Sequence, residues 1–329
     1  MTDVLIVGAG LSGLMAATQL QAAGQAVLVL DKGRGVGGRL ATRRIGPGRA
    51  DHGAQFFTVR DPQFAAYVAE WEAEGLVYVW SDGWSAEADG HPRYVVRNGM
   101  TALAKRLAQN LDVRTEVKVT AVSGWQGQTT AVSSGWQVVT ENGRSYQSQA
   151  LILTPPVPQS LALLDAGGVV LDAADRSTLE AIRYAPCLCG LFWVAGEATL
   201  PYPGAVQGDE NDTLAWLADN RRKGISPEAR LLTFHAGIPF SQRHYEDPSE
   251  LVLPLLAQEL APYLAVDATI REAQLKRWRY ARPQTLYSER CLPAAGLPRL
   301  VFAGDAFNGP RVEGAALSGL AAAAKLLNN

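Results

Sequence analysis

The first thirty-one residues constrain the fold of this chain more than any other segment. Residues 3–7 form a short apolar run, residues 11–23 carry Leu14, Ala17 and Leu20 on one helical face, and residues 26–30 form a second apolar run. Between the first run and the helix, residues 8–13 read G-A-G-L-S-G, and Asp31 follows the second run. This order of strand, glycine turn, helix, strand and acid predicts a βαβ unit that binds a dinucleotide.

Each glycine of this turn has a separate physical task. Gly8 permits the tight turn, Gly10 lets the backbone approach a pyrophosphate, and Gly13 allows the helix to pack closely on the strand. Unpaired amides and the helix dipole then stabilise the phosphate charge. Asp31 can accept hydrogen bonds from ribose hydroxyls, and its charge disfavours a 2′-phosphate. The alternative is a glycine-rich turn that binds nothing.

A second match to the same glycine pattern occurs at residues 33–38. No βαβ unit follows it, and no acid stands at the expected spacing, so we do not interpret it as a second dinucleotide fold. The sequence therefore predicts one built-in dinucleotide and no separate NAD(P)H domain.

Composition favours a globular protein with small-molecule partners. A length of 329 residues predicts two structural domains, and a composition of 47% hydrophobic and 19% charged residues is typical of a globular protein. The net charge of −2 argues against nucleic acid or anionic lipid as a partner. Cys187, Cys189 and Cys291 provide neither a disulfide framework nor a zinc site, and we expect buried or half-buried thiols. No basic signal-peptide region and no membrane-spanning apolar run is present, so we expect a cytoplasmic protein without a metal; the oligomeric state stays open.

The remaining elements follow from hydrophobic periodicity and turn residues. Asp61-Pro62 predicts a helix start, and Asn142-Gly143 predicts a hairpin turn between residues 136–140 and the strand from residue 145. Further helices are expected at 100–111, after Asp247-Pro248 and at 312–327, and further strands at 151–154, 187–194, 231–235, 273–280 and 300–303. The predicted fold is α/β. A Rossmann-type domain comprises 1–60, 97–165 and 281–329, and an interleaved α+β substrate domain comprises 61–96 and 166–280.

Residues after Asp31 distinguish the class of dinucleotide. Residues 31–39 (D-K-G-R-G-V-G-G-R), 51–58 (D-H-G-A-Q-F-F-T) and the Gly304-Asp305 and 309–315 segments resemble the fingerprints of the flavin-containing amine oxidase superfamily. The resemblance implies FAD, with Arg39 pairing with the diphosphate, Asp305 holding the ribityl chain and the helix start near Gly314 facing the flavin. The cofactor residues implied are Gly8, Gly10, Leu11, Ser12, Gly13, Asp31, Lys32, Gly38, Arg39, Ala54, Gln55, Val119, Thr154, Gly304, Asp305, Val312, Gly314 and Ala315.

A narrower set of motifs is similar to bacterial renalase-type flavoproteins. It comprises residues 51–58, 156–159 (P-V-P-Q), 277–283 (R-W-R-Y-A-R-P) and 311–315 (R-V-E-G-A), although Lys276 stands where that group has histidine. The resemblance implies oxidation of 2- or 6-dihydro isomers of NAD(P) to NAD(P)+ by hydride transfer to flavin N5, with O2 reduced to H2O2. No cysteine stands at the place used for covalent flavin attachment, so we expect FAD to be bound non-covalently.

Hydride transfer to flavin needs positioning and exclusion of water rather than a nucleophile, so no residue is assigned as catalytic. The expected substrate contacts are Gln55, Phe56, Thr58, Arg97, Asn98, Gly99, Cys187, Trp278 and Tyr280. Core packing is the alternative for the aromatic residues. His52 lies beside the implied flavin segment, and we expect a structural or solvated role for it. His235 is expected to be a core residue. Two other functions stay open: an amine oxidase-like or carotenoid-type oxidoreductase, and a non-enzymatic binding protein on the same fold.

Overall fold

The computed structural model describes residues 2–84, 89–125 and 134–328, and it divides the chain into two compact units. The first unit comprises residues 1–38, 104–183 and 283–329, and the second unit comprises residues 39–103 and 184–282. Both combine helices with a sheet, which confirms the predicted α/β class.

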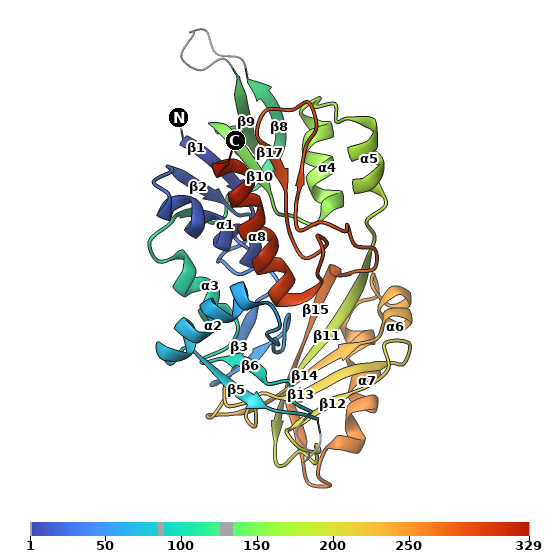
Figure 1. Cartoon of the computed structure of the whole chain (residues 1–329). Coiled ribbons are helices and arrows are strands. Elements are labelled where there is room, and N and C mark those ends of the chain that lie inside the picture. The colour runs from blue at the N-terminus through green and yellow to red at the C-terminus, as the bar shows by residue number, and fades with distance from the viewer. Residues whose placement is uncertain (1, 85–88, 126–133, 329) are drawn as a thin grey trace. The chain divides into compact units, whose positions relative to one another are not determined.

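Parallel strands form the centre of the first unit (Figure 1). Its described residues build an eight-stranded sheet in the order β16-β17-β10-β1-β2-β7, with β9 paired to β10 and β8 to β9. The strands are β1 (Thr2–Val7), β2 (Val27–Leu30), β7 (Asp112–Arg114), β8 (Val119–Trp125), β9 (Gly135–Thr140), β10 (Ser145–Leu153), β16 (Leu292–Pro293) and β17 (Leu300–Phe302). β1 pairs in parallel with both β10 and β2, and its apolar run suits a strand buried on both faces.

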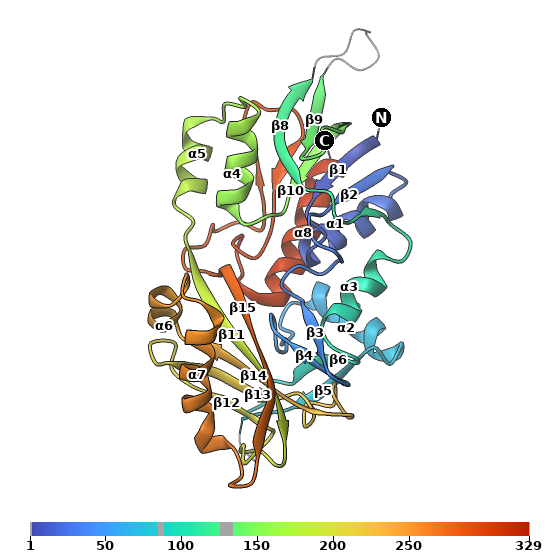
Figure 2. The same ribbon diagram turned by 180° about the vertical axis from the view of Figure 1, so that it is seen from behind.

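Two long helices of the first unit, α1 (Leu11–Ala22) and α8 (Arg311–Leu327), lie side by side against this sheet (Figures 1 and 2). Gly319 allows their close approach, because a Cβ atom at this position would lie 2.1 Å from the Ser12 carbonyl oxygen. Helices α4 (Val157–Ala166) and α5 (Ala173–Glu180) pack against each other, and α4 packs against β8. The motif-bearing ends of the chain, residues 8–13 and 304–315, thus belong to one packed unit.

An antiparallel five-stranded sheet forms the centre of the second unit, in the order β12-β13-β14-β11-β15. Its strands are β11 (Tyr184–Ala195), β12 (Ala205–Gln207), β13 (Leu214–Asp219), β14 (Arg230–Ala236) and β15 (Thr269–Pro283). Two hairpins, β3 (Thr42–Ile45) with β4 (Gly48–Asp51) and β5 (Val77–Ser81) with β6 (Arg93–Val96), accompany it. The helices are α2 (Pro62–Ala73), α3 (Thr101–Ala108), α6 (Ile238–Arg243), α7 (Ser249–Leu260) and the 3-10 turn η1 (Ala261–Tyr263). α3 runs across the boundary at residues 103–104, so its end belongs to the first unit.

The two faces of this sheet have different roles, because side chains alternate along each strand. Leu188 and Phe192 of β11 pack with Leu256 of α7 on one face. Cys189 and Leu191 of β11 belong to a different apolar cluster, which includes Ile45 and Ala50 of the β3–β4 hairpin. We call this second face, covered by the hairpin, the inner face.

Most predicted elements are confirmed with small changes of boundary. Asp61 caps α2 by accepting a hydrogen bond from the Gln63 amide at 2.8 Å, and the hairpin turns at Asn142-Gly143, with Gly143 at a φ of 78°. The predicted helix at 100–111 is shorter, and the strand predicted at 273–280 extends over Thr269–Pro283. The β3–β4 hairpin and helices α4 and α5 were not predicted.

The compact units also differ from the predicted domain boundaries. Residues 39–60 and 97–103 lie in the second unit, since the β3–β4 hairpin packs on β14 and Met100 hydrogen-bonds to Asp51. Residues 166–183 lie in the first unit, since α5 packs on α4 and Asp175 accepts a hydrogen bond from the Ala295 amide. The assignment of cofactor and substrate to these units remains a prediction.

Candidate functional site

The glycine turn of the first unit has the geometry of a phosphate-binding loop. Gly8 has a φ of 104°, and a Cβ atom there would lie 2.4 Å from Thr154 Oγ1. A Cβ atom at Gly13 would lie 2.0 Å from the Gly8 carbonyl oxygen, so strand and helix approach as the sequence predicts. Gly10 differs from both, because a Cβ atom there would meet nothing within 4 Å. The N-terminus of α1 has no side-chain cap. This combination leaves a cradle at Gly10.

Asp31 ties this turn to the loop that follows β2. Its Oδ2 accepts a hydrogen bond from the Ala9 amide and its Oδ1 accepts one from the Gly33 amide, both at 2.6 Å. Lys32 donates to Gln159 Oε1 at 3.3 Å. Gly38, with a φ of 52°, passes over Gly10, since its Cβ position is 3.4 Å from the Gly10 Cα. The segment after Asp31 therefore lies along the glycine turn, as the resemblance implied.

The C-terminal motif lies beside the same strands. Gly304 adopts a φ of 144° and donates its amide to Ser318 Oγ at 2.8 Å, and Asp305 directly after it is 8% exposed. The start of the motif lies beside the end of β10, since the Ala303 amide donates to the Leu153 carbonyl oxygen at 3.0 Å and the Gly304 Cβ position is 3.7 Å from the Thr154 carbonyl oxygen. The N-terminus of α8 carries no side-chain cap, and Arg311 adopts a φ of 85° there. The uncapped starts of α1 and α8 thus both belong to the first unit.

In the second unit, Asp51 organises the turn that follows β4. Its Oδ1 accepts hydrogen bonds from Thr42 Oγ1 at 2.6 Å and the Met100 amide at 2.8 Å, and its Oδ2 lies 2.9 Å from Lys223 Nζ. The side chains of Asp51 and Lys223 are both 0% exposed. Thr233 of β14 donates to the Asp51 carbonyl oxygen at 2.8 Å. A fully buried ion pair therefore joins the β3–β4 hairpin to the central sheet.

Gln55 closes this turn, and its expected contact with substrate and cofactor stays a prediction. Its Nε2 donates to the carbonyl oxygens of Asp51 at 2.7 Å and Gly53 at 3.1 Å, and its Oε1 lies 3.4 Å from Lys223 Nζ. The residue is 6% exposed. Both amide hydrogens are therefore engaged inside the turn.

His52 and His235 meet on the inner face of the sheet. The His52 ring stacks on Trp278, with centroids 5.3 Å apart, and the Trp278 indole donates to the His52 carbonyl oxygen at 2.7 Å. His235 stands in β14 directly between its cross-strand partners Trp216 and Cys189. Burial lowers the pKa of each imidazole from 6.5 to about 4. Both histidines are therefore neutral at physiological pH.

Phe56 faces an aromatic cluster on the same side of the sheet. Its ring centroid lies 5.1 Å from that of Trp84, 5.4 Å from that of Trp216 and 6.5 Å from that of Trp80. Within the described residues, four buried nitrogens of this region have no hydrogen-bond partner: His52 Nδ1, His235 Nε2, Trp80 Nε1 and Trp216 Nε1. Buried polar atoms are normally satisfied, so these nitrogens are polar positions that the described packing of the second unit leaves without a partner.

Other predicted substrate residues have their polar groups engaged elsewhere in the second unit. Arg97 donates to the Gly75 carbonyl oxygen, and Asn98 Oδ1 accepts from Arg49. A Cβ atom at Gly99 would lie 2.5 Å from the Thr42 side chain. These three residues connect β6 to α3, and the Met100 amide that follows them donates to Asp51 Oδ1. Their contact with substrate stays a prediction.

The remaining predicted residues of the second unit lie in strands β11 and β15 or in the segments on either side of the β3–β4 hairpin. Tyr280 packs edge-to-face on Tyr184, and Arg39 donates to the Tyr280 carbonyl oxygen at 3.2 Å. Ala54 donates its amide to the Arg39 carbonyl oxygen at 2.8 Å, and Thr58 is half-buried. Burial raises the pKa of the Cys187 thiol to about 12, so this side chain is a poor nucleophile.

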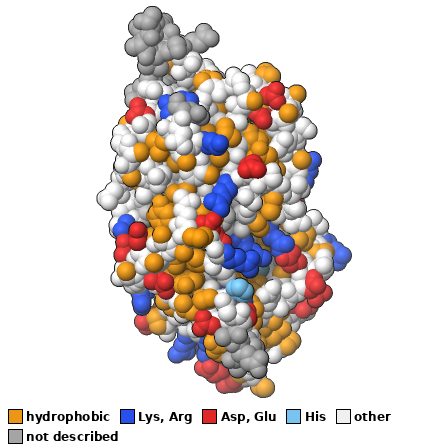
Figure 3. All heavy atoms as spheres, viewed as in Figure 1, with side chains coloured by type: hydrophobic (Ala, Val, Ile, Leu, Met, Phe, Trp, Pro, Cys, Tyr) orange, Lys and Arg blue, Asp and Glu red, His pale blue; other side chains and the backbone are white. Residues whose placement is uncertain are grey.

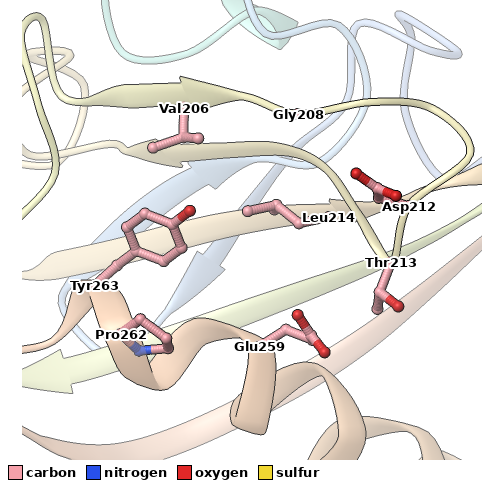
Figure 4. A pocket seen from close by; sticks show the side chains of 8 residues that line it. All are labelled: Val206, Gly208, Asp212, Thr213, Leu214, Glu259, Pro262 and Tyr263. Atoms are coloured by element: carbon pink, nitrogen blue, oxygen red, sulfur yellow. The ribbon is translucent and has the colours of Figure 1, made fainter.

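An open hollow of about 450 Å³ is present elsewhere in the second unit (Figure 4). It lies between the β12–β13 hairpin and the α7–η1 segment, and Asp212, Leu214, Glu259 and Tyr263 contribute to its lining. Leu214 and Tyr263 pack against the apolar cluster of the opposite sheet face. None of the predicted site residues lines this hollow, and we assign it no role.

The surface shows no preference for one sign of charge on the face drawn in Figure 3, where Lys and Arg are interspersed with Asp and Glu. Among residues 2–84, 89–125 and 134–328, no group of three His, Cys, Asp or Glu side chains could hold a metal ion. In the same ranges, no helix is both long enough and apolar enough to cross a membrane.

Comparison with known proteins identifies the family. The model of the flavin-containing amine oxidoreductases matches residues 64–327, and that of an NAD(P)-binding Rossmann-like domain matches residues 6–71. The chain belongs to the flavin-containing amine oxidoreductase family. Mouse (Mus musculus) renalase is 25% identical to this family member over 97% of each chain. The fold is shared with a protein assigned as a protoporphyrinogen oxidase from Exiguobacterium sp. 255-15 (13% identity, TM-score 0.72) and with putrescine oxidase bound to putrescine (16%, 0.67). Both comparisons cover 100% of this chain and 99% of the other.

Family membership implies a flavin oxidoreductase, and the first unit fits FAD. The cradle at Gly10 and the uncapped start of α1 suit a diphosphate. Ser12 in the first turn of that helix is 5% exposed, and its hydroxyl oxygen has no hydrogen-bond partner among the described residues. An orphaned donor beside an open glycine cradle is the arrangement that a bound phosphate completes.

Sequence reasoning missed two parts of this region. Lys223 lies in a turn after β13 and carries no local motif, so only the packing of β4 on β14 reveals its partner Asp51. His235 was expected to be a satisfied core residue, yet its Nε2 has no partner. A signal was present in the sequence, since β14 places a histidine among apolar residues of a buried strand.

Proposed function

We propose that this chain is an oxidase of renalase type that binds FAD non-covalently and oxidises 2- or 6-dihydro isomers of NAD(P) to NAD(P)+. When FAD is bound, its chemistry is hydride acceptance at N5 and reoxidation by O2 to give H2O2. One observation carries the proposal: the unpartnered nitrogens of His52, His235, Trp80 and Trp216 lie among flat aromatic rings. A dihydronicotinamide offers a planar ring for stacking, and its carboxamide would reach these buried nitrogens after the side chains around them move. A cytoplasmic location remains the prediction from sequence.

The proposed residue roles follow from this geometry. Gly8, Gly10, Ser12 and Gly13 would hold the diphosphate at the start of α1, while Asp305 and the start of α8 would hold the flavin end. Phe56 and Trp278 would provide stacking surfaces for substrate. The thiols support non-covalent binding, because burial raises the pKa values of Cys187, Cys189 and Cys291.

The charges near His52 disfavour an amine substrate. Lys276 and Arg43 both contribute to lowering the His52 pKa, after the larger effect of burial. A protonated amine would be repelled by these cations, whereas the phosphates of a dinucleotide would be attracted. Lys276 adds to this positive potential. It stands where the resemblance to renalase-type proteins implies a histidine.

Anaerobic stopped-flow absorbance tests the proposal. NADH aged to contain 2- and 6-dihydro isomers, purified 4-dihydro NADH and an amine panel that includes putrescine are mixed separately with the flavoprotein. We expect rapid bleaching of the flavin only by the 2- or 6-dihydro isomers, with NAD+ as product and H2O2 on admission of O2. Bleaching by amines alone would overturn the proposal in favour of an amine oxidase.

A further inference from the structure

We propose that Lys223 is a positioning residue for substrate binding: its buried ammonium group holds the Asp51 carboxylate and the Gln55 carboxamide so that the turn between them presents His52 and Phe56 to substrate. The location of substrate at these side chains rests on the proposed function. The arrangement of Lys223, Asp51 and Gln55, which we call the clamp, does not rest on the proposed function.

Burial makes this ion pair unusual. Lys223 is 1% exposed and Asp51 is 0% exposed, and removal of two charges from water costs free energy that their attraction does not reliably return. Apolar residues of similar size would serve stability equally well. A buried pair of this kind is better suited to selecting one geometry, here the docking of the β3–β4 hairpin on β14.

The ammonium group also sets the orientation of Gln55. With Lys223 Nζ at 3.4 Å from Oε1, the amide nitrogen must point to the carbonyl oxygens of Asp51 and Gly53, to which it donates. The reversed carboxamide would place two N–H groups against an ammonium ion. Lys223 therefore favours the closed form of the turn, in which Gln55 Nε2 donates to the carbonyl oxygens of Asp51 and Gly53.

The closed turn has functional consequences on both sides. His52 stacks on Trp278 at one side, and Phe56 packs on Trp216 at the other, with His235 of β14 paired to Trp216. Lys223 Nζ itself lies 5.9 Å from the centre of the Trp80 ring. Loss of the clamp would allow His52 and Phe56 to move apart while the sheet below them stays in place.

The first experiment measures the turn without substrate or flavin turnover. The ring signals of His52 are titrated by NMR in the wild type, in Lys223→Met and in the charge-neutral pair Asp51→Asn with Lys223→Met, which avoids an unpaired buried carboxylate. Burial, Lys276 and Arg43 lower the His52 pKa, so we expect removal of Lys223 to act on that pKa through the position of the turn. We expect the His52 pKa to rise from about 4 toward 6.5 in both variants as the turn opens. An unchanged His52 pKa in the folded double variant would overturn the proposal.

Two controls separate positioning from loss of stability. Leu256→Ala removes apolar packing on the opposite face of the sheet, and it should lower the melting temperature without moving the His52 pKa. Gln55→Leu should reproduce the His52 shift, and combining it with Lys223→Met should add nothing further, because both act on the same turn. Additive shifts would show that Lys223 does not act through Gln55.

Kinetics then tests the link to substrate. In the double variant we expect KM for the dihydronicotinamide to rise roughly tenfold, while the limiting rate of flavin reduction changes less than about threefold. Displaced His52 and Phe56 side chains should weaken substrate binding more than they slow hydride transfer. Unchanged KM together with a shifted His52 pKa would overturn the substrate role. If wild-type protein fails to react with any dihydronicotinamide, the proposed function fails, and the NMR titration still decides whether Lys223 holds the turn.

Discussion

At the scale of residues, the second unit buries several polar and charged side chains, and such burial costs free energy unless each group has a partner. Asp51 and Lys223 form a buried ion pair and Lys223 donates to Gln55, whereas the imidazoles of His52 and His235 each retain a nitrogen without a partner in the described structure. Neutral histidines and thiols with raised pKa values offer no strong base or nucleophile. That chemistry suits hydride transfer, where the protein supplies orientation and dryness.

The two histidines should make stability depend on pH. Their pKa values are about 4 in the folded protein and 6.5 ordinarily, so the unfolded chain binds protons first as the pH falls. The free energy of unfolding should therefore decrease from pH 6.5 down to pH 4, by at most about 3 kcal/mol per histidine and less for the half-buried His52. Urea unfolding at pH 7 and pH 5 measures this decrease.

The matched variant for this measurement is His52→Gln combined with His235→Gln. It should flatten the dependence of stability on pH between 4 and 6.5, because glutamine does not titrate. Equal slopes for the variant and the wild type would contradict the assignment of the pH effect to these two residues.

At the scale of elements, we propose that α1 and α8 share the task of binding the cofactor. Their contact depends on Gly319, whose missing side chain leaves room for the Ser12 carbonyl oxygen. Both helix starts lack a side-chain cap, which leaves amides available for a ligand. The spacing of the two helices thus sets the spacing of the two proposed binding ends.

Gly319→Ala should separate these helices. Its Cβ atom would lie 2.1 Å from a backbone oxygen, so α8 must shift, and we expect a loss of about 1–3 kcal/mol in the free energy of unfolding together with weaker FAD binding. Thermal unfolding and retention of FAD on gel filtration measure the two effects. Ala324→Ser on the exposed side of the same helix is the control and should change neither. Wild-type FAD retention in Gly319→Ala would argue against a shared binding task.

At the scale of the whole molecule, the fold and the chemistry are coupled through FAD. Family membership implies the flavin, and the predicted contacts come from segments at both ends of the first unit, residues 8–13 and 304–315. A ligand that binds only the folded chain stabilises it in proportion to the logarithm of its concentration.

Removal of FAD should therefore lower the melting temperature, and its return should restore it. At a free FAD concentration of 100 times Kd, the expected stabilisation is about 2.7 kcal/mol. Differential scanning fluorimetry of the apoprotein against increasing FAD measures this gain, and AMP serves as a partial ligand for comparison. A melting temperature independent of FAD would contradict binding at this site.

The sequence by itself determined the parts of this protein that depend on local chemistry. Glycines at positions 8, 10 and 13, apolar runs on either side and a closing Asp31 specify the βαβ unit, because turn geometry and strand burial depend on neighbouring residues. Asp61 and the Asn142-Gly143 turn were readable for the same reason. The flavin motifs were recognised from short runs of residues.

Only the tertiary structure decided which distant side chains meet. Gln55 and Lys223 are 168 positions apart, and no periodicity connects them. Their contact results from packing the β3–β4 hairpin on β14, a long-range choice that depends on the whole sheet. The same packing placed residues 39–60 in the second unit and engaged both amide hydrogens of Gln55 within its own turn, while its contact with substrate stays a prediction.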